Sequence, residues 1–132
     1  MKQLNSILLV DDDFTANFLH TEILNDMGIV REILTALDGE EAIQVLSSLC
    51  AANKCPELIL LDINMPKMNG FEVLEKVKSL NLSNISGNAV VVMLSSSLNP
   101  SDVKRAGEMN AKRYLSKPLH EEEMRQLLDD FF

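Results

Sequence analysis

The sequence predicts a three-layer α/β sandwich, in which a five-stranded parallel sheet lies between two layers of helices. Three observations support this prediction. Five short apolar runs alternate with longer segments in which apolar residues recur every three or four positions. Strands separated by helices pair in parallel through right-handed crossovers. The length of 132 residues suits one compact domain, so we expect a single domain over residues 1–132.

The predicted strands are short apolar runs bounded by polar or turn residues. Residues 7–10 (ILLV) are continuously apolar, which is typical of a parallel strand covered by helices on both faces. Residues 58–61 (LILL) show the same pattern, and they predict a second strand of this buried kind. The remaining strands are predicted at 31–37, 89–94 and 112–115.

The first predicted helix follows the first strand. Ala16, Leu19, Ile23 and Met27 recur at spacings of three and four, so we expect them to form its core-facing stripe. Gly28 suits the end of this helix, because glycine readily adopts the left-handed conformation found just after many helices. The helix is therefore expected to end immediately before Gly28.

Four later helices are predicted from their apolar spacing or from capping residues. Asn69 and Asn99 suit the N-cap position, and Pro100 suits the first helical position. The polar segment 81–88 is expected to be a loop that is longer than most connections. The predicted apolar stripes are Ala42, Ile43, Leu46 and Leu49; Phe71, Leu74 and Val77; and Met124, Leu127, Leu128 and Phe131.

Charge and hydropathy exclude several classes of protein. Twelve Lys and Arg against twenty Asp and Glu give a net charge of 12 − 20 = −8. This charge repels nucleic acid and anionic membranes, so we predict that the chain binds neither. No apolar run approaches the roughly 20 residues of a transmembrane helix, and the first residues do not resemble a signal peptide. We therefore expect a cytoplasmic protein.

The two cysteines, Cys50 and Cys55, have a spacing that matches no common motif. They form neither a Cys-x-x-Cys redox pair nor a zinc-ligand pattern. Disulfides are rare in the reducing cytoplasm. We therefore expect two free thiols.

The two histidines are expected to have structural rather than catalytic surroundings. His20 lies one turn after Ala16, at the edge of the predicted stripe, so we expect a partly buried structural side chain. His120 begins the last predicted helix beside the acidic residues 121–123. Acids are favourable in the first turn of a helix, so this run is expected to face solvent.

Polar side chains gather where the predicted strands end. Three aspartates at 11–13 follow the first strand, Asp62 follows the third, and Ser95 follows the fourth. Lys117 comes just after the fifth strand. Because the carboxyl ends of parallel strands share one edge of a sheet, we expect these groups to meet there.

This combination of groups points to phosphoryl chemistry with a divalent cation. Carboxylates gathered in one pocket repel each other unless a cation joins them. Hard oxygen ligands suit Mg²⁺, so we predict a site formed by Asp11, Asp12 and Asp62, with Asp13 as a helix cap. A carboxylate beside a metal and a lysine is also a possible nucleophile toward phosphorus, because both cations offset the added charge.

Four segments together resemble a known family. They are ILLVDDD at 7–13, LLDINMPKMNGFEVL at 60–74, VVMLSSS at 91–97 and YLSKPL at 114–119. Along its whole length the chain resembles the receiver domain of two-component response regulators. The resemblance implies a flavodoxin-like fold with strand order 2-1-3-4-5, known from the family's chemotaxis regulator. It also implies a receiver domain without an output domain.

The resemblance assigns a role to each polar residue at the strand ends. Asp62 would be the phosphoacceptor, receiving a phosphoryl group from a histidine of a sensor kinase. Asp12 would bind Mg²⁺ directly, Asp11 mainly through water, and Asn64 through its backbone carbonyl. Lys117 would pair with the phosphoryl group. The chain would carry only its own autophosphorylation and autodephosphorylation chemistry and would not be an enzyme in the usual sense.

The resemblance also implies a switch. Ser95 matches the hydroxyl that binds a phosphoryl oxygen, and Tyr114 matches the aromatic residue that then turns inward. The change would alter the face formed by the fourth helix, the fifth strand and the fifth helix, where a downstream protein would bind. The Lys117–Pro118 bond resembles one that is cis in the family. We expect a monomer or a weak dimer.

Three alternatives remain open from the sequence. Phosphorylated Asp62 could act as a terminal signal, or it could pass its phosphoryl group to a histidine phosphotransfer domain. A small aspartyl-phosphate phosphatase is less favoured, because such enzymes generally place an acid two residues after the nucleophile, and here that residue is Asn64. A receiver that binds partners without phosphorylation is disfavoured, because the pocket residues are all present.

Overall fold

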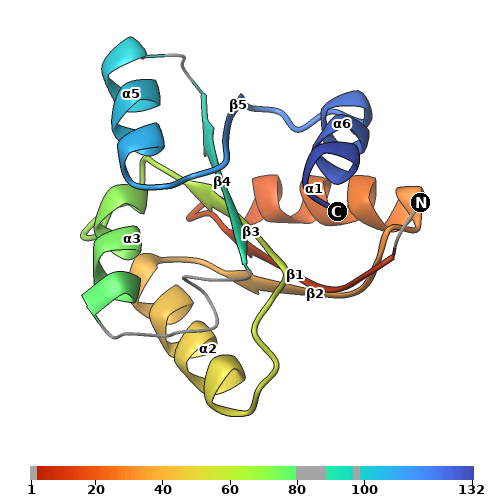
Figure 1. Cartoon of the computed structure of the whole chain (residues 1–132), viewed down its shortest axis with the longest axis horizontal. Helices are drawn as coiled ribbons and strands as arrows, with labels where there is room; N and C mark the ends of the chain where they lie inside the picture. The colour runs from red at the N-terminus through yellow and green to blue at the C-terminus, as the bar shows by residue number, and fades with distance from the viewer. Residues whose placement is uncertain (1–2, 80–88, 97–98) are drawn as a thin grey trace.

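The computed structural model describes residues 3–79, 89–96 and 99–132, and the predicted loop 81–88 lies outside these ranges. Figure 1 shows the labels of the helices and strands used below. None of the helices within these ranges is long and apolar enough to cross a membrane. In chain order the elements are β1 Leu4–Val10, α1 Phe14–Met27, β2 Val30–Ala36, α2 Gly39–Ala51, β3 Leu58–Asp62, α3 Gly70–Ser79, β4 Val90–Ser95, α5 Pro100–Glu108, β5 Arg113–Ser116 and α6 Glu121–Phe131.

The five strands form one parallel sheet in the order β2-β1-β3-β4-β5. This order confirms the prediction. In the register, Val10 of β1 lies opposite Leu61 of β3, and Asp62 lies opposite Leu94 of β4. The strands β1, β3 and β4 therefore end at nearly the same height along the sheet, so that the residues following them lie at one edge.

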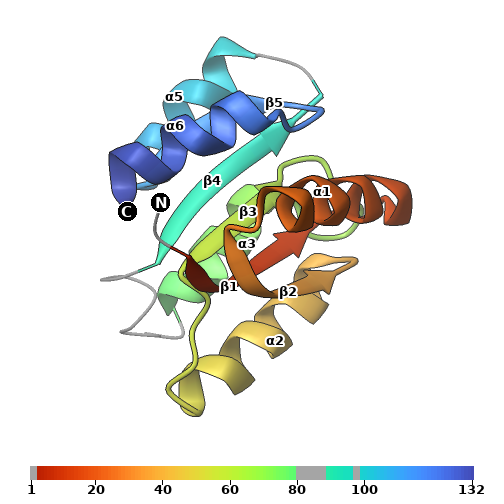
Figure 2. The same ribbon diagram turned by 90° about the vertical axis from the view of Figure 1, so that its right-hand side faces the viewer.

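Helices cover both faces of the sheet, as the three-layer prediction requires. Figures 1 and 2 show α1 and α6 on one face and α2, α3 and α5 on the other. Each face has its own apolar core. One includes Leu46, Phe71 and Ala106 from the three-helix layer, and the other includes Leu24 and Leu127 from the two-helix layer. The strands β1, β3 and β4 supply side chains to both cores from their buried apolar runs, which explains why these runs are uninterrupted.

Capping side chains fix the helix ends near the functional edge. Asp13 accepts a hydrogen bond from the Thr15 backbone N–H, and Asn99 accepts one from that of Ser101. At the start of α3, Asn69 and Glu72 cap each other reciprocally through their backbone N–H groups. These contacts confirm the three predicted caps. Gly28 follows α1 with a φ of 65°, the left-handed conformation expected there.

The prediction for the core-facing side of α1 was wrong. The buried residues of this helix are Asn17, His20 and Leu24, whereas Leu19, part of the predicted stripe, is 52% exposed. The sheet-facing side is therefore rotated by about one residue from the prediction. The reason is that Asn17 and His20 find hydrogen-bond partners in the interior, so their polarity does not exclude them from it. His20 is fully buried rather than at the edge.

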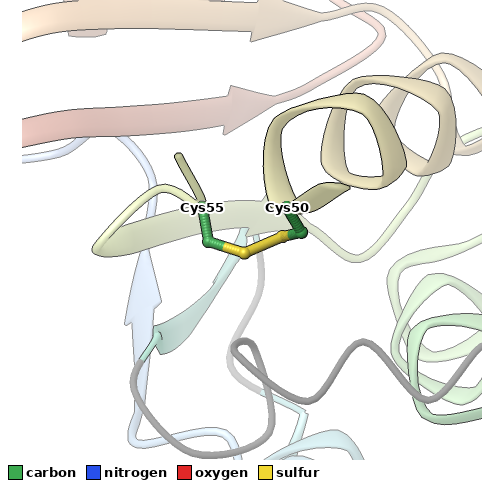
Figure 3. Close-up of a disulfide and its surroundings, with 2 residues drawn as sticks. All are labelled: Cys50 and Cys55. Atoms are coloured by element: carbon green, nitrogen blue, oxygen red, sulfur yellow. A yellow bond between two sulfur atoms is a disulfide. The ribbon is translucent and has the colours of Figure 1, made fainter. Parts of the chain in front are cut away.

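The prediction of two free thiols was also wrong. Cys50, at the end of α2, and Cys55, just before β3, form a disulfide with 4.4 Å between their Cα atoms (Figure 3). The chain turns back sharply between them, so that a backbone N–H of Lys54 donates to the carbonyl of Leu49. A tight turn brings the two sulfur atoms together, although the spacing matches no common motif. The disulfide lies before β3, away from the strand ends that carry the acids.

Candidate functional site

Three aspartates meet at the carboxyl edge of the sheet. Asp11 and Asp12 follow β1, and Asp62 is the last residue of β3. One carboxylate oxygen from each of the three lies within 4.8 Å of the others. Asp11 and Asp62 are buried, while Asp12 is exposed. The structure thus brings together the acids that the sequence places at the ends of different strands, with one side of the cluster open to solvent.

Lys117 joins this cluster from the turn after β5. Its Nζ lies 2.6 Å from Asp11 Oδ2 and 3.1 Å from Asp62 Oδ1. Its backbone N–H donates to the carbonyl of Ser95 at 2.8 Å, so the turn is attached to the end of β4. The Lys117–Pro118 peptide bond is cis, as the resemblance implies. The amine therefore bridges the two buried carboxylates.

Local hydrogen bonds orient the acid at the end of β1. The backbone N–H of Asp13 donates to Asp11 Oδ1 at 2.9 Å. The side-chain amide of Asn17, one turn into α1, donates to the Asp11 carbonyl oxygen at 3.0 Å. Both the carboxylate and the backbone of Asp11 are therefore held by the start of α1.

The loop after Asp62 passes close to the start of α3. The backbone N–H of Asn64 donates to Asp62 Oδ1 at 3.4 Å, and that of Gly70 donates to the Ile63 carbonyl at 2.9 Å. A Cβ atom at Gly70 would lie 2.6 Å from the Asp62 backbone oxygen. Only glycine fits this approach, so Gly70 helps to set the position of Asp62.

We expect Gly70→Ala to damage both the fold and the site. The added methyl group would push against the backbone of Asp62, which cannot move aside as a flexible side chain could. We expect the free energy of unfolding to fall by about 2 kcal/mol or more. Urea denaturation measures the change. Gly107→Ala is the matched control, because nothing lies within 4 Å of its added Cβ atom. If Gly70→Ala and Gly107→Ala have the same free energy of unfolding, the packing argument is wrong.

The surroundings of Asp62 and Lys117 shift their protonation in the same direction. Burial, and then the charge of Asp11, raise the pKa of Asp62 to about 6, although Lys117 and the Asn64 N–H oppose the shift. Burial alone would lower the pKa of Lys117. Its hydrogen bond to Asp11 and the charges of Asp62 and Asp11 outweigh burial, so that the pKa is raised. At neutral pH the site therefore holds one cation among crowded carboxylates.

Because the pKa of Asp62 is raised, the folded metal-free protein should be less stable above about pH 6, where this carboxyl group is ionised. The folded chain holds this proton more tightly than the unfolded chain, whose aspartate has an ordinary pKa of 3.8. The cost is therefore full above about pH 6 and absent below about pH 3.8. We expect Asp62→Asn to stabilise the protein in EDTA at pH 8 by up to about 3 kcal/mol.

The test is urea unfolding of both proteins in EDTA from pH 8 to pH 4. The gain from Asp62→Asn should shrink as the pH falls through 6, because the wild-type carboxyl then becomes protonated. A gain that stays constant over this range, or a loss of stability at pH 8, would show that the carboxylate is not disfavoured in the fold.

The donor set at this edge fits Mg²⁺. Three carboxylates supply hard oxygen ligands, and the exposed side at Asp12 leaves room for the water molecules that Mg²⁺ retains. Lys117 alone cannot neutralise three acids, so a divalent cation would lower the remaining repulsion.

Ser95 and Tyr114 lie on the neighbouring strands β4 and β5. Ser95 ends β4 and is completely buried, and its carbonyl holds the Lys117 turn. Tyr114 is partly buried and packs against the apolar core on the α2, α3 and α5 side of the sheet. Ser95 thus lies at the acidic edge, and Tyr114 lies on the adjacent strand β5, opposite Met93 of β4.

Two buried polar residues near the site were not predicted to contact it: Asn17 was not considered, and His20 was expected to be only a partly buried structural side chain. Asn17 contacts the backbone of Asp11, and His20 accepts a hydrogen bond from the Leu119 backbone N–H at 3.4 Å. Their spacing of three matches that of one helical face, and Leu24 continues the face. This spacing could have indicated the buried face of α1. The apolar residues Ala16, Leu19 and Ile23 recur at the same spacing, however, and they were chosen instead.

Comparison with known proteins identifies the family. The family model described as a response regulator receiver domain matches residues 7–129. This chain belongs to the response regulator receiver domain family. The receiver domain therefore belongs to two-component signalling, and phosphorylation and Mg²⁺ binding are typical of its family.

Individual relatives support the same assignment. A crystal structure of a two-component response regulator from Cytophaga hutchinsonii is 36% identical, with a TM-score of 0.92 and 98% of each chain covered. A probable chemotaxis protein CheY from Rhizobium etli is 28% identical over 126 residues, covering 96% of this receiver domain and 91% of the relative. The transcriptional regulatory protein CpxR of Klebsiella pneumoniae is 33% identical over 121 residues. The match covers 92% of this chain but only 46% of CpxR, so the receiver domain spans about half the length of that relative.

Proposed function

We propose that this receiver domain accepts a phosphoryl group on Asp62 from a phosphohistidine of a sensor histidine kinase or a histidine phosphotransfer protein. The observation that carries the proposal is the position of Lys117, whose amine lies 3.1 Å from Asp62 Oδ1 beside two further carboxylates. A buried carboxylate with a cation at this distance can receive a phosphoryl group without leaving its charge uncompensated.

The transfer would exchange one bond to phosphorus for another. A carboxylate oxygen of Asp62 attacks the phosphorus atom, and the bond between phosphorus and the donor nitrogen breaks. The electron pair of that bond returns to the donor imidazole, so no other reactant is required. Asp62 must be ionised to attack, and its pKa of about 6 leaves it mostly so at neutral pH.

The neighbouring residues would bind the cation and the new phosphoryl oxygens. Asp11, Asp12, Asp62 and the backbone carbonyl of Asn64 would hold Mg²⁺, which when bound would supply positive charge next to the phosphoryl group. Lys117 would turn from the carboxylates to a phosphoryl oxygen. Its raised pKa keeps it protonated for this role.

Phosphorylation would be communicated to a protein-binding surface. Ser95 would donate its hydroxyl hydrogen bond to the phosphoryl group, and Tyr114 would repack against the core. These movements would alter the face formed by α5, β5 and α6, which correspond to the predicted fourth helix, fifth strand and fifth helix. A downstream protein would bind this face in one of its two states.

We further propose that residues 1–132 form a single receiver domain, which acts in the cytoplasm as a monomer or weak dimer. A terminal signalling role and a relay role, in which Asp62 passes its phosphoryl group to a histidine phosphotransfer domain, both remain compatible with this site. A phosphatase is less well supported, because Asn64 stands where such enzymes generally carry an acid.

The proposal is tested by exposing the purified protein to acetyl phosphate with Mg²⁺ and measuring intact mass. We expect the mass of one added phosphoryl group, lost again under mild alkali as an acyl phosphate. Subsequent incubation with candidate histidine phosphotransfer domains separates the relay role from the terminal role. A chain that gains no phosphoryl group from any small-molecule donor or kinase would refute the proposal.

A further inference from the structure

The turn that carries Lys117 is attached to the fold on both sides. On one side, the Lys117 backbone N–H donates to the carbonyl of Ser95 in β4. On the other side, the Leu119 backbone N–H donates to Nε2 of His20 in α1, 99 residues away in sequence. Pro118 between them has no N–H to donate. The two backbone donors of the turn thus contact β4 and α1, respectively.

The His20 side of this attachment is buried and fixed relative to the acids. His20 is 3% exposed and Leu119 is 1% exposed. One turn earlier in α1, Asn17 is 4% exposed and holds the Asp11 backbone oxygen. The start of α1 is thereby tied to Asp11, and the next turn is tied to Leu119. This helix therefore links Asp11 to the turn that carries Lys117.

We propose that His20 is a positioning residue for Lys117: by accepting the Leu119 N–H, its ring holds the turn so that the lysine amine lies between Asp11 and Asp62. The predicted effect of His20 on the reaction rate rests on the proposed phosphoryl transfer. The hydrogen bond between His20 and Leu119 does not depend on that proposal. His20 contacts Leu119 rather than the reacting atoms, so it acts only through the placement of Lys117.

The chemistry of the ring agrees with this role. A nitrogen that accepts a hydrogen bond carries no proton, so the ring must be neutral with its hydrogen on Nδ1. Burial lowers the pKa of His20, Asp11 opposes this shift, and Lys117 adds to it. An acceptor is thus available at neutral pH where a buried backbone N–H needs one.

Two substitutions of His20 separate the hydrogen bond from the packing. His20→Leu fills the space with an apolar side chain of comparable size but removes the acceptor. His20→Gln places an amide oxygen near the position of Nε2 and can restore it. We expect phosphorylation by acetyl phosphate with Mg²⁺ to slow roughly 10-fold or more in His20→Leu, because small displacements of a charge-stabilising group cost much rate. His20→Gln should recover most of the loss.

A structural defect alone would give a different pattern. Leu24→Ala is the matched control, because Leu24 is completely buried on the same face of α1, one turn farther along. It should lower stability without slowing the reaction at temperatures where it stays folded. In a Lys117→Ala background, His20→Leu should slow the reaction no further, since the residue through which it acts has been removed. An equal slowing in both backgrounds, or in Leu24→Ala, would overturn the inference.

Hydrogen exchange tests the contact without phosphorylation. The Leu119 amide should be protected in the wild type and in His20→Gln and should exchange faster in His20→Leu, where the Lys117 Cε resonance should also move. If the wild type accepts no phosphoryl group but these changes occur, the proposed function fails and the positioning role stands. Unchanged Leu119 exchange and Lys117 resonances in His20→Leu would refute the positioning role itself.

Discussion

Replacing Asp62 by asparagine is expected to reduce phosphorylation by acetyl phosphate to background. The amide has nearly the shape of the carboxylate, so the buried position at the end of β3 should remain filled. The asparagine side chain lacks the anionic oxygen that attacks phosphorus. Among the described residues, the other carboxylate in contact with Lys117 is that of Asp11, and it is held by the start of α1. Intact-mass spectrometry after exposure to acetyl phosphate and Mg²⁺ measures the loss.

Asp13→Asn is the matched control for this substitution. It makes the same chemical change at an exposed aspartate of the same DDD run, where the side chain caps α1 and asparagine caps equally well. We expect wild-type labelling in this variant. Normal labelling of Asp62→Asn, with the label located in the pocket, would show that another residue is the phosphoacceptor.

Removing the amine of Lys117 should have the second largest effect, first on stability. Lys117 is 20% exposed in its side chain and contacts two carboxylates that are each 4% exposed. Lys117→Ala would leave these buried charges without their cation. We expect the free energy of unfolding in EDTA at pH 8 to fall by about 3 kcal/mol, because breaking a buried ion pair on one side leaves an uncompensated charge.

Magnesium should reverse much of this loss. A divalent cation that binds only the folded chain stabilises it, and it replaces the missing positive charge. We expect Lys117→Ala to remain able to accept a phosphoryl group. It should lose the phosphorylation-dependent change at Tyr114 that we expect NMR to detect in the wild type. Lys112→Ala is the control, because Lys112 is exposed and should change stability by no more than about 0.5 kcal/mol. Equal stability of the two lysine variants in EDTA would contradict the bridging role.

The fold was predictable because its main signals are local. Continuous apolar runs such as 58–61 are buried on both faces, and strands alternating with helices leave few topologies. The same reasoning placed the acids, since the carboxyl ends of parallel strands share one edge. Neither the apolar runs nor the positions of the acids at the strand ends predict how far apart the side chains lie. The 4.8 Å grouping of the acids and the bridging position of Lys117 depend on register and on turns that close in three dimensions.

The failures of prediction have a common physical origin. The buried face of α1 depends on the partners of Asn17 and His20, and the partner of His20 lies 99 residues away. A rule that buries only apolar residues cannot foresee such a pair. Likewise, the disulfide depends on how sharply the chain turns between Cys50 and Cys55, which their spacing alone does not reveal. The close approach of Gly70 to the Asp62 backbone likewise arises from the packing of α3, and no local sequence signal reveals it.

The central claim is that Asp11, Asp12 and Asp62 share one divalent cation beside Lys117. The most direct measurement is a crystal structure with Mn²⁺ in place of Mg²⁺, in which anomalous scattering locates the ion. We predict a single peak within bonding distance of Asp12 and Asp62, with Asp11 close enough to reach it through one water molecule. A peak elsewhere on the chain, or a pocket without any peak at saturating Mn²⁺, would contradict the account.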